Sequence, residues 1–285
     1  MKSNWGAANG TALHWVLENY ANACRGTHED GTIVSKEDSL WMLDWKANIL
    51  NIFERGHKHQ TDKSFSILDL AKDKDYVAKP KNCQTCPYFK DNICNIAKEN
   101  VDTLRGCPKY LYEDNLDLLS CFMKRMKKIY TKGKILGVEA EFDIDLGQND
   151  IHGTPMHVLG FMDFIHEYDS ETLEMIDYKA GSHTQTYDEV YNDIQARIYS
   201  LALRQKYPQY QNYMLTFDYL REKPVTVTYT PADDEVTKQR LIEKWTQIAA
   251  PQNVNRSIGW WCKAMCDKAK CDIEWPKFVE KFSKK

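Results

Sequence analysis

The sequence contains no long apolar run. No window of its 285 residues reaches the roughly 18 apolar residues that a membrane-spanning helix requires. The first residues, MKSNWGAANGTALHWVLE, lack the basic region, the apolar stretch and the small-residue cleavage site of a secretory signal. We therefore expect a cytoplasmic protein without a membrane anchor.

An excess of basic residues is also missing, since 38 lysines and arginines face 41 acidic residues and the net charge is -3. The overall charge therefore does not indicate a nucleic-acid-binding protein, and any DNA contact must come from a local patch. One basic run precedes a predicted strand and contains Lys124, Arg125, Lys127 and Lys128. Such a run either neutralises DNA phosphates or forms an ordinary solvated helix face.

Cysteine, in contrast, is plentiful, with nine residues, seven of which gather in two places. Cytosolic thiols stay reduced, so clustered cysteines indicate metal ligation rather than disulfides, with scattered free thiols as the alternative. The first group includes a CxxC pair and suits one tetrahedral site for Zn²⁺ or a 4Fe-4S cluster; it comprises Cys83, Cys86, Cys94 and Cys107. The second group is a triplet without an obvious fourth ligand: Cys262, Cys266 and Cys271.

The hydrophobic periodicity predicts an α/β fold with a central mixed sheet flanked by helices. Helices are expected over residues 8–24, 36–55, 111–130, 187–206 and 232–249, and strands over 135–146, 156–166, 172–179, 212–220 and 224–230. Because a polar and cysteine-rich stretch separates the first helices from the strands, we expect one domain with an inserted metal-binding module. The expected parts are 1–57 (helical), 58–110 (insertion), 111–250 (core) and 251–285 (cysteine-bearing tail).

Three polar residues mark the second and third expected strands. Asp177 and Lys179 lie two apart on one strand and therefore share a face, while Tyr178 points away. Asp163, near the end of the preceding strand, joins them if the two strands are neighbours. Two carboxylates suit a hard divalent cation, and a nearby ammonium orients water, so the set fits phosphodiester hydrolysis. A charged strand edge gives the same letters without chemistry.

Residues on the expected helices extend this set. Gln195 and Tyr199 are four apart and share a helix face, as a substrate-facing pair or as a solvated Gln and a core Tyr. His14 lies on the first helix, four residues after Gly10, as a metal ligand or an ordinary surface or core histidine. Glu139 and Glu141 are two apart on the first expected strand and therefore share a face. They either support a metal site or belong to an exposed strand face.

Together these motifs resemble the RecB-type branch of the PD-(D/E)XK nuclease superfamily, which includes CRISPR-adaptation nucleases and many phage exonucleases. The motifs occur in the family's order: Gly-x-x-x-His (Gly10, His14), Gly-x-x-Asp (Gly160, Asp163), Asp-Tyr-Lys (Asp177 to Lys179) and Gln-x-x-x-Tyr (Gln195, Tyr199). The resemblance covers residues 8–25 and about 135–230. Each motif alone is common, whereas the ordered set is specific.

The resemblance implies a restriction-endonuclease-like core and hydrolysis of DNA with Mg²⁺ or Mn²⁺, most often by an exonuclease. It implies that His14, Asp163, Asp177 and the carbonyl of Tyr178 bind the metal, and that Lys179 positions water. Gln195 and Tyr199 would support the site and the DNA backbone. The implied setting is recombination, repair or phage DNA metabolism in a bacterial or phage-infected cell, with protein partners in such a complex.

The tail triplet is similar to the family's C-terminal cysteines, which hold an iron-sulfur cluster with a fourth ligand from before the nuclease core. The nine residues before Gly10 contain no cysteine, so either Cys24, Cys107 or Cys121 completes that set or the triplet is a structural remnant. Two other functions remain open at this point. One is a non-catalytic DNA-binding or adaptor protein on a nuclease-like scaffold, and the other is a purely structural zinc protein.

Overall fold

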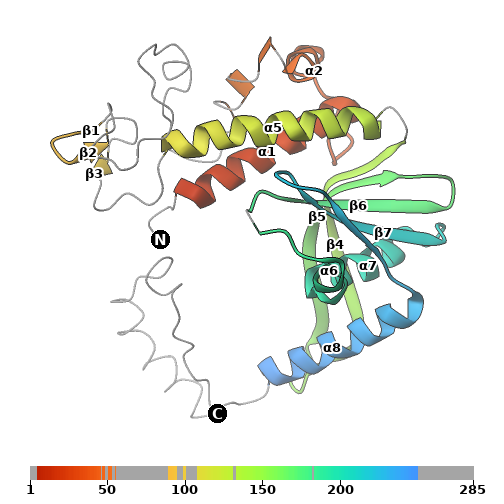
Figure 1. Ribbon diagram of the computed structural model, residues 1–285. Helices are drawn as coiled ribbons and strands as arrows, with labels where there is room; N and C mark the ends of the chain where they lie inside the picture. The colour runs from red at the N-terminus through yellow and green to blue at the C-terminus, as the bar shows by residue number, and fades with distance from the viewer. Residues whose placement is uncertain are drawn as a thin grey trace.

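The computed structural model describes residues 5–45, 47–48, 51–52, 55, 89–94, 99–100, 108–130, 133–181 and 183–249. Within them, a five-stranded mixed sheet lies between two layers of helices (Figure 1). This arrangement confirms the expected α/β fold with helices on both faces of a central sheet. Among these residues, no helix combines the length and the apolar character that a membrane crossing would need.

The sheet has the strand order β4-β5-β6-β7-β8. Its strands are β4 (Ile135–Asn149), β5 (Pro155–Glu167), β6 (Thr172–Lys179), β7 (Asn212–Tyr219) and β8 (Val225–Thr228). Neighbouring strands are antiparallel except β6 and β7, which run parallel. A parallel pair requires a crossover connection, and helices supply it here. Strand β6 is buried along nearly its whole length because both of its faces are covered.

Helices α1 (Trp5–Arg25) and α5 (Pro108–Tyr130) cover one face of the sheet. On α1, the buried residues Leu13, Val16, Leu17 and Tyr20 recur at helical spacing and form one apolar stripe. This stripe belongs to one hydrophobic cluster with Phe122 of α5 and with buried side chains of β5 and β6 on the same face of the sheet. The first helix is therefore part of the core around the sheet, although Arg25 at its end and Ile135 at the start of β4 are 110 positions apart in the sequence.

Helices α6 (Tyr187–Asn192), α7 (Ile194–Lys206) and α8 (Pro231–Ala249) lie on the other face. The helix expected over 187–206 is in fact two helices, because Asp193 ends α6 and begins α7. Its backbone is extended, and its side chain accepts a hydrogen bond from the backbone N–H of Gln195 at 2.8 Å. An aspartate in this role stabilises a new helix start and fixes the direction of the residues that follow.

The remaining described elements are short. Helix α2 (Lys36–Leu43) ends at its C-cap Asp44, so the helix expected over 36–55 is interrupted there, and the described residues 45, 47–48, 51–52 and 55 are again helical. A small antiparallel sheet consists of β1 (Phe89–Lys90), β2 (Ile93–Cys94) and β3 (Glu99–Asn100). Of the cysteines expected to bind metal, only the backbone of Cys94 belongs to the described residues; those outside are Cys83, Cys86, Cys107, Cys262, Cys266 and Cys271. Cys24 and Cys121 are free thiols.

A glycine on β5 makes room for an aromatic ring that reaches the candidate site. Gly160 pairs with Phe142 across the two strands, and the Phe142 ring lies over the glycine. A Cβ atom on Gly160 would lie 2.6 Å from the Cζ atom of Phe142. The same ring contacts Tyr199 of α7 edge to face, with the ring centroids 6.0 Å apart. The glycine of the Gly-x-x-Asp motif thus has a packing role.

We predict that Gly160→Ala lowers the free energy of unfolding by about 1–3 kcal/mol, because the added methyl group displaces the Phe142 ring. The displacement should also move Tyr199 and reduce any activity of the site. Thermal or urea unfolding measures the first effect. Gly10→Ala is the matched control, since a Cβ there meets nothing within 4 Å and alanine favours the helix. Equal stability of Gly160→Ala and the wild type would contradict the packing role.

Candidate functional site

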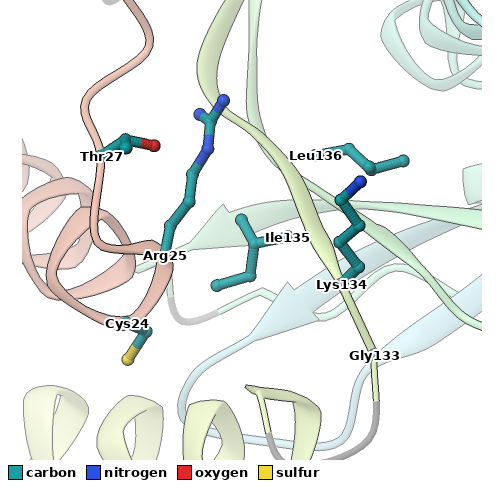
Figure 2. A pocket seen from close by; sticks show the side chains of 7 residues that line it. All are labelled: Cys24, Arg25, Thr27, Gly133, Lys134, Ile135 and Leu136. Atoms are coloured by element: carbon teal, nitrogen blue, oxygen red, sulfur yellow. The ribbon is translucent and has the colours of Figure 1, made fainter. Parts of the chain in front are cut away.

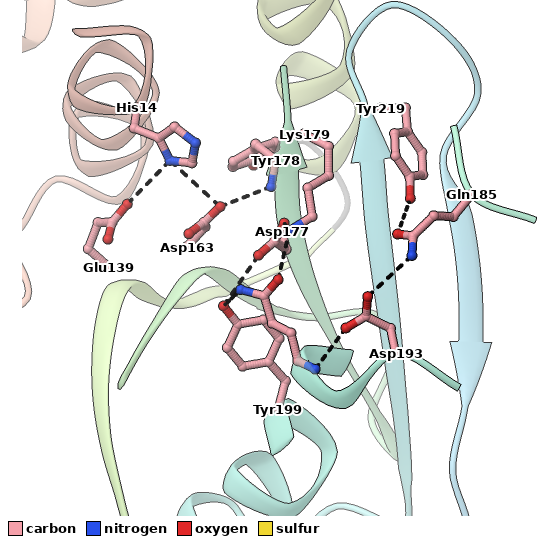
Figure 3. A network of polar contacts seen from close by, with 11 residues as sticks. His14, Glu139, Asp163, Asp177, Tyr178, Lys179, Gln185, Asp193, Tyr199 and Tyr219 are labelled. Carbon is pink, nitrogen blue, oxygen red and sulfur yellow. Dashed lines mark hydrogen bonds and ion pairs between the residues drawn. The ribbon is translucent and has the colours of Figure 1, made fainter. Parts of the chain in front are cut away.

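The polar residues singled out in the sequence line one cavity of about 450 Å³ at an end of the sheet. They come from four separate elements: His14 from α1, Asp163 from β5, Asp177 to Lys179 from β6, and Gln195 and Tyr199 from α7. Figure 3 shows the side chains of His14, Asp163, Asp177, Lys179 and Tyr199 gathered in one place. The loop after β6 completes the described lining with Ala180, Gly181, His183 and Gln185, and Tyr219 comes from the end of β7.

The alternation of β6 places its three motif residues as expected. Asp177 and Lys179 point to the α7 face, where they contact Gln195 and Tyr199. Tyr178 points to the opposite face and packs against Phe122 of α5. The backbone N–H of Tyr178 donates to the Oδ2 atom of Asp163 at 2.9 Å. This bond ties β5 to β6 at the point where the acidic side chains converge.

Four side chains form a closed ring of polar contacts. Lys179 Nζ donates to the Oδ2 atom of Asp177 at 2.6 Å and to the Oε1 atom of Gln195 at 2.8 Å. Gln195 Nε2 donates to the Tyr199 hydroxyl at 2.8 Å, and that hydroxyl donates to the Oδ1 atom of Asp177 at 3.3 Å. Because each of the four contacts pairs a donor with an acceptor, the ammonium group is held in one position. It also lies 4.4 Å from the centre of the Phe217 ring.

A second set of contacts, which sequence reasoning did not identify, connects to this ring at the start of α7. The Tyr219 hydroxyl donates to Gln185 Oε1 at 2.7 Å, and Gln185 Nε2 donates to Asp193 at 3.2 Å. Asp193 in turn caps α7 at the N–H of Gln195. The chain connects the loop after β6 to the start of α7 (Figure 3). Only Asp193 carried a recognisable signal, that of an N-cap residue before an apolar helix.

His14, Glu139 and Asp163 form a second group beside the ring. The Nδ1 atom of His14 lies 3.8 Å from Asp163 Oδ2 and 4.0 Å from Glu139 Oε1. One ligand atom from each of the three residues lies within 4.8 Å of the other two. Glu139 adopts a positive φ of 51°, which departs from regular strand geometry next to a β-bulge. Of the two glutamates considered in the sequence, Glu139 joins the group and Glu141 is solvent-exposed.

Negative charge is crowded in this group. Burial and the neighbouring Asp177 raise the pKa of Asp163 to about 7. Burial also raises the pKa of Asp177, although Lys179 opposes the shift. The Glu139 carboxylate raises the pKa of His14 against the effect of burial, and burial together with Glu139 raises the pKa of Glu18, one turn further along α1. Carboxylates that are held close together and away from water favour the binding of a proton or a cation.

The basic run on α5 has two kinds of members. Lys124, Lys127 and Lys128 are solvent-exposed. Arg125 instead forms an ion pair with Asp218 of β7, and its guanidinium also donates to the carbonyl of Glu222. Burial raises the pKa of Asp218, and the arginine opposes that shift. Arg125 therefore joins α5 to the end of β7, while the three lysines keep their ammonium groups at the surface.

We predict that Asp163→Asn raises the melting temperature of the metal-free protein by a few degrees at pH 8. The pKa of Asp163 is about 7 in the fold and about 3.9 in an unfolded chain, so the folded state binds the proton more tightly. The contribution of this carboxyl to stability is therefore full below about pH 4 and is lost as the pH rises through about 7. Asparagine avoids that loss and still accepts the Tyr178 N–H.

Melting curves in EDTA between pH 5 and pH 8 measure this effect, and the gain should shrink toward pH 5. The exposed aspartate of α5, Asp117, provides the control, because Asp117→Asn should give no pH-dependent gain. A lower melting temperature of Asp163→Asn at pH 8 would show that the carboxylate stabilises the metal-free fold.

Comparison with known protein families places these residues in context. The model of the PD-(D/E)XK nuclease superfamily matches residues 89–272, well over half of the chain. No curated protein matches the chain at a significant level. The matched range includes Asp163, Asp177 and Lys179, whereas His14 lies before it and reaches the same cavity through the packing of α1. On the strength of this match, the chain belongs to the PD-(D/E)XK nuclease superfamily.

Proposed function

We propose that the protein is a metal-dependent DNA nuclease of the RecB-type branch, acting as an exonuclease. The observation that carries the proposal is that His14 and Asp163 share one cavity with the Lys179–Asp177 pair. Glu139 joins His14 and Asp163 in a group whose ligand atoms could hold one cation. Membership of a nuclease superfamily supports the same conclusion. Phosphodiester hydrolysis requires a cation site and an oriented water next to each other, and this cavity offers donors for both.

The side chains fit a divalent cation such as Mg²⁺ or Mn²⁺. Carboxylate oxygens are the ligands that these hard cations prefer, and an imidazole nitrogen is compatible with Mn²⁺. Burial and the neighbouring Asp177 raise the pKa of Asp163, although His14 and the backbone N–H of Tyr178 oppose the shift, and a bound cation would stabilise the carboxylate further. We propose His14, Glu139 and Asp163 as ligands, with Asp177 and the carbonyl of Tyr178 completing the set. A cation there supplies Lewis-acid polarisation of the phosphate and activation of water.

Lys179 has the position expected for a residue that orients the attacking water. Its ammonium group is partly exposed to the cavity, while Asp177 and Gln195 occupy two of its three donor directions. The remaining direction is available for a water molecule or a phosphate oxygen. Attack of that water on phosphorus releases the 3′ oxygen of one nucleotide and leaves a 5′-phosphate on the other. During this attack, the ammonium stabilises the negative charge on the phosphate in the transition state.

Gln195 and Tyr199 act as positioning residues. They hold the Lys179–Asp177 pair from the α7 side through the closed ring of hydrogen bonds. Burial raises the pKa of Tyr199 well above its ordinary value, so its hydroxyl keeps its proton and donates to Asp177. The two side chains fix the direction of the ammonium group relative to the acidic group around Asp163.

The remaining proposals concern the surroundings of the site. We infer that Lys124, Lys127 and Lys128 contribute sequence-independent contacts to DNA phosphates. Arg125 would join these contacts only through guanidinium N–H groups that its ion pair with Asp218 does not use. We also propose that segment 58–110 is a metal-binding insertion and that 251–285 is a cysteine-bearing tail, with Zn²⁺ or a 4Fe-4S cluster as the group held. Recombination, repair or phage DNA metabolism, in complex with other proteins, is the setting that this function would serve.

The decisive experiment is the degradation of end-labelled single- and double-stranded DNA with Mg²⁺, Mn²⁺ or EDTA. We expect metal-dependent cleavage by the wild type and a rate lower by about 10²–10³-fold in Asp177→Asn and Lys179→Ala, because each removes a charge from the reacting centre. Circular dichroism checks that both variants fold. A wild type that binds DNA but cleaves nothing with either metal would replace this function with that of a non-catalytic adaptor.

The two glutamates of β4 provide a test of the cation site. Glu139→Gln should raise the metal concentration needed for half-maximal cleavage by about 10–100-fold, because a ligand charge is lost. Glu141 is two residues further along the same strand, exposed and outside the group, so Glu141→Gln should leave that metal concentration unchanged. Titration of the cleavage rate with Mn²⁺ measures the difference. The same shift in both variants would mean that only the general negative potential matters.

A further inference from the structure

A second cavity of about 570 Å³ lies where α1 ends and β4 begins. Figure 2 shows it between the end of the helix and the first residues of the strand. Its described lining comprises Cys24, Arg25, Thr27, Gly133, Lys134, Ile135 and Leu136. None of these residues belongs to the candidate catalytic site. Both charged residues in this lining, Arg25 and Lys134, are cations.

The two elements that border this cavity also carry part of the catalytic group. On α1, Arg25 follows His14 by eleven residues, a rise of about 16 Å along a helix. Lys134, the residue before β4, precedes Glu139 by five residues, a length of about 17 Å along a strand. The two estimates agree, so the cavity lies about 16 Å from the acidic group. At 3.4 Å per stacked nucleotide, this distance corresponds to about five nucleotides of a DNA strand.

The chemistry of the lining suits a phosphate. Arg25 donates to Glu29 at 2.6 Å, and the same carboxylate oxygen accepts the N–H of Val138 at 3.2 Å. Glu29 is thus held against the edge of the sheet, and the fork of five N–H donors on Arg25 retains further donors. Lys134 is exposed, and Thr27 adds a hydroxyl group. Burial raises the pKa of the Cys24 thiol to about 12, so it remains neutral and does not repel an anion.

We propose that this cavity binds a phosphate group of the DNA strand that is cleaved at the site around Asp163, about five nucleotides away. The inference rests on the proposed function and deepens it, because it assigns a path and a minimum length to the substrate. Arg25 pairs with two phosphate oxygens through its planar guanidinium, and Lys134 adds a point charge. A strand that follows the seam between α1 and β4 reaches both sites. A shorter strand reaches only the catalytic site.

The test is DNA binding by the intact protein with Ca²⁺ in place of the catalytic metal, measured by fluorescence anisotropy. Single strands of 4 and 12 nucleotides are compared for the wild type, Arg25→Gln, Lys134→Gln and the double variant, with about 10-fold weaker binding of the 12-nucleotide strand expected for the double variant. Its slope of log affinity against log salt should fall by about 1 for each lost contact. The 4-nucleotide strand should bind all proteins equally.

Arg240→Gln, which removes an exposed arginine of α8, is the matched control and should behave as the wild type. Strands with a 5′-phosphate or a 5′-hydroxyl identify the group bound: a loss confined to 5′-phosphorylated DNA assigns a terminal phosphate, and an equal loss assigns an internal phosphodiester. Unchanged affinity and salt slope in the double variant would overturn the proposal, as would equal weakening for both lengths. Because no cleavage is required, an inactive wild type would overturn the nuclease function without affecting this result.

Discussion

The carboxylates of Asp163 and Asp177 lie next to each other and away from bulk water, and the surrounding structure compensates for their mutual repulsion. Asp163 accepts the backbone N–H of Tyr178 and lies near His14. Asp177 forms the ion pair with Lys179 and accepts the hydroxyl of Tyr199. The compensation is incomplete, since the pKa values of both carboxyl groups stay above their ordinary range. A site with unbalanced negative charge is prepared for a cation at the expense of stability.

Helices on both faces of the sheet position the side chains around these carboxylates. On one face, α7 supplies the neutral donors and acceptors that fix Lys179, and Asp193 determines where that helix starts. Gly160 and Phe142 place the ring of Tyr199 from the same side. On the other face, the apolar stripe of α1 packs against the sheet and sets the position of the first helix. Each polar group in the site therefore depends on apolar packing behind it.

Helix α1 and strand β4 connect the catalytic group to the second cavity. Both elements pass from the acidic group to the second cavity, whose charged lining residues are Lys134 and Arg25, the latter paired with Glu29. Under the proposed function, the negative charge on each phosphate of a DNA strand would attract it to the second cavity without a bound metal. At the acidic end, the same strand would require a cation that neutralises the carboxylates. In that proposal, binding precedes cleavage, which waits for the metal.

Much of this organisation was encoded locally. The alternation in β6 predicted which face Asp177 and Lys179 share, because the side-chain period of a strand is fixed by the backbone. Helical spacing likewise predicted the burial of α1, and the positions of the strands followed from their β-branched and aromatic residues. The ordered motifs indicated a RecB-type member of the PD-(D/E)XK nuclease superfamily, and the match over residues 89–272 shows the superfamily. Periodicity did not reveal the break at Asp193, because a single capping residue interrupts a helix without changing the apolar pattern on either side.

Tertiary structure alone decided which polar residues meet. Glu139 and Glu141 are equivalent in the sequence, yet an irregular backbone at Glu139 directs one toward His14 while the other remains exposed. Arg125 stands among lysines in the sequence but pairs with Asp218, which is 93 residues away. The sequence by itself thus determined the elements and the chemical types, since these depend on local spacing. The contacts between distant segments depended on how the helices pack on the sheet, and no local pattern records that packing.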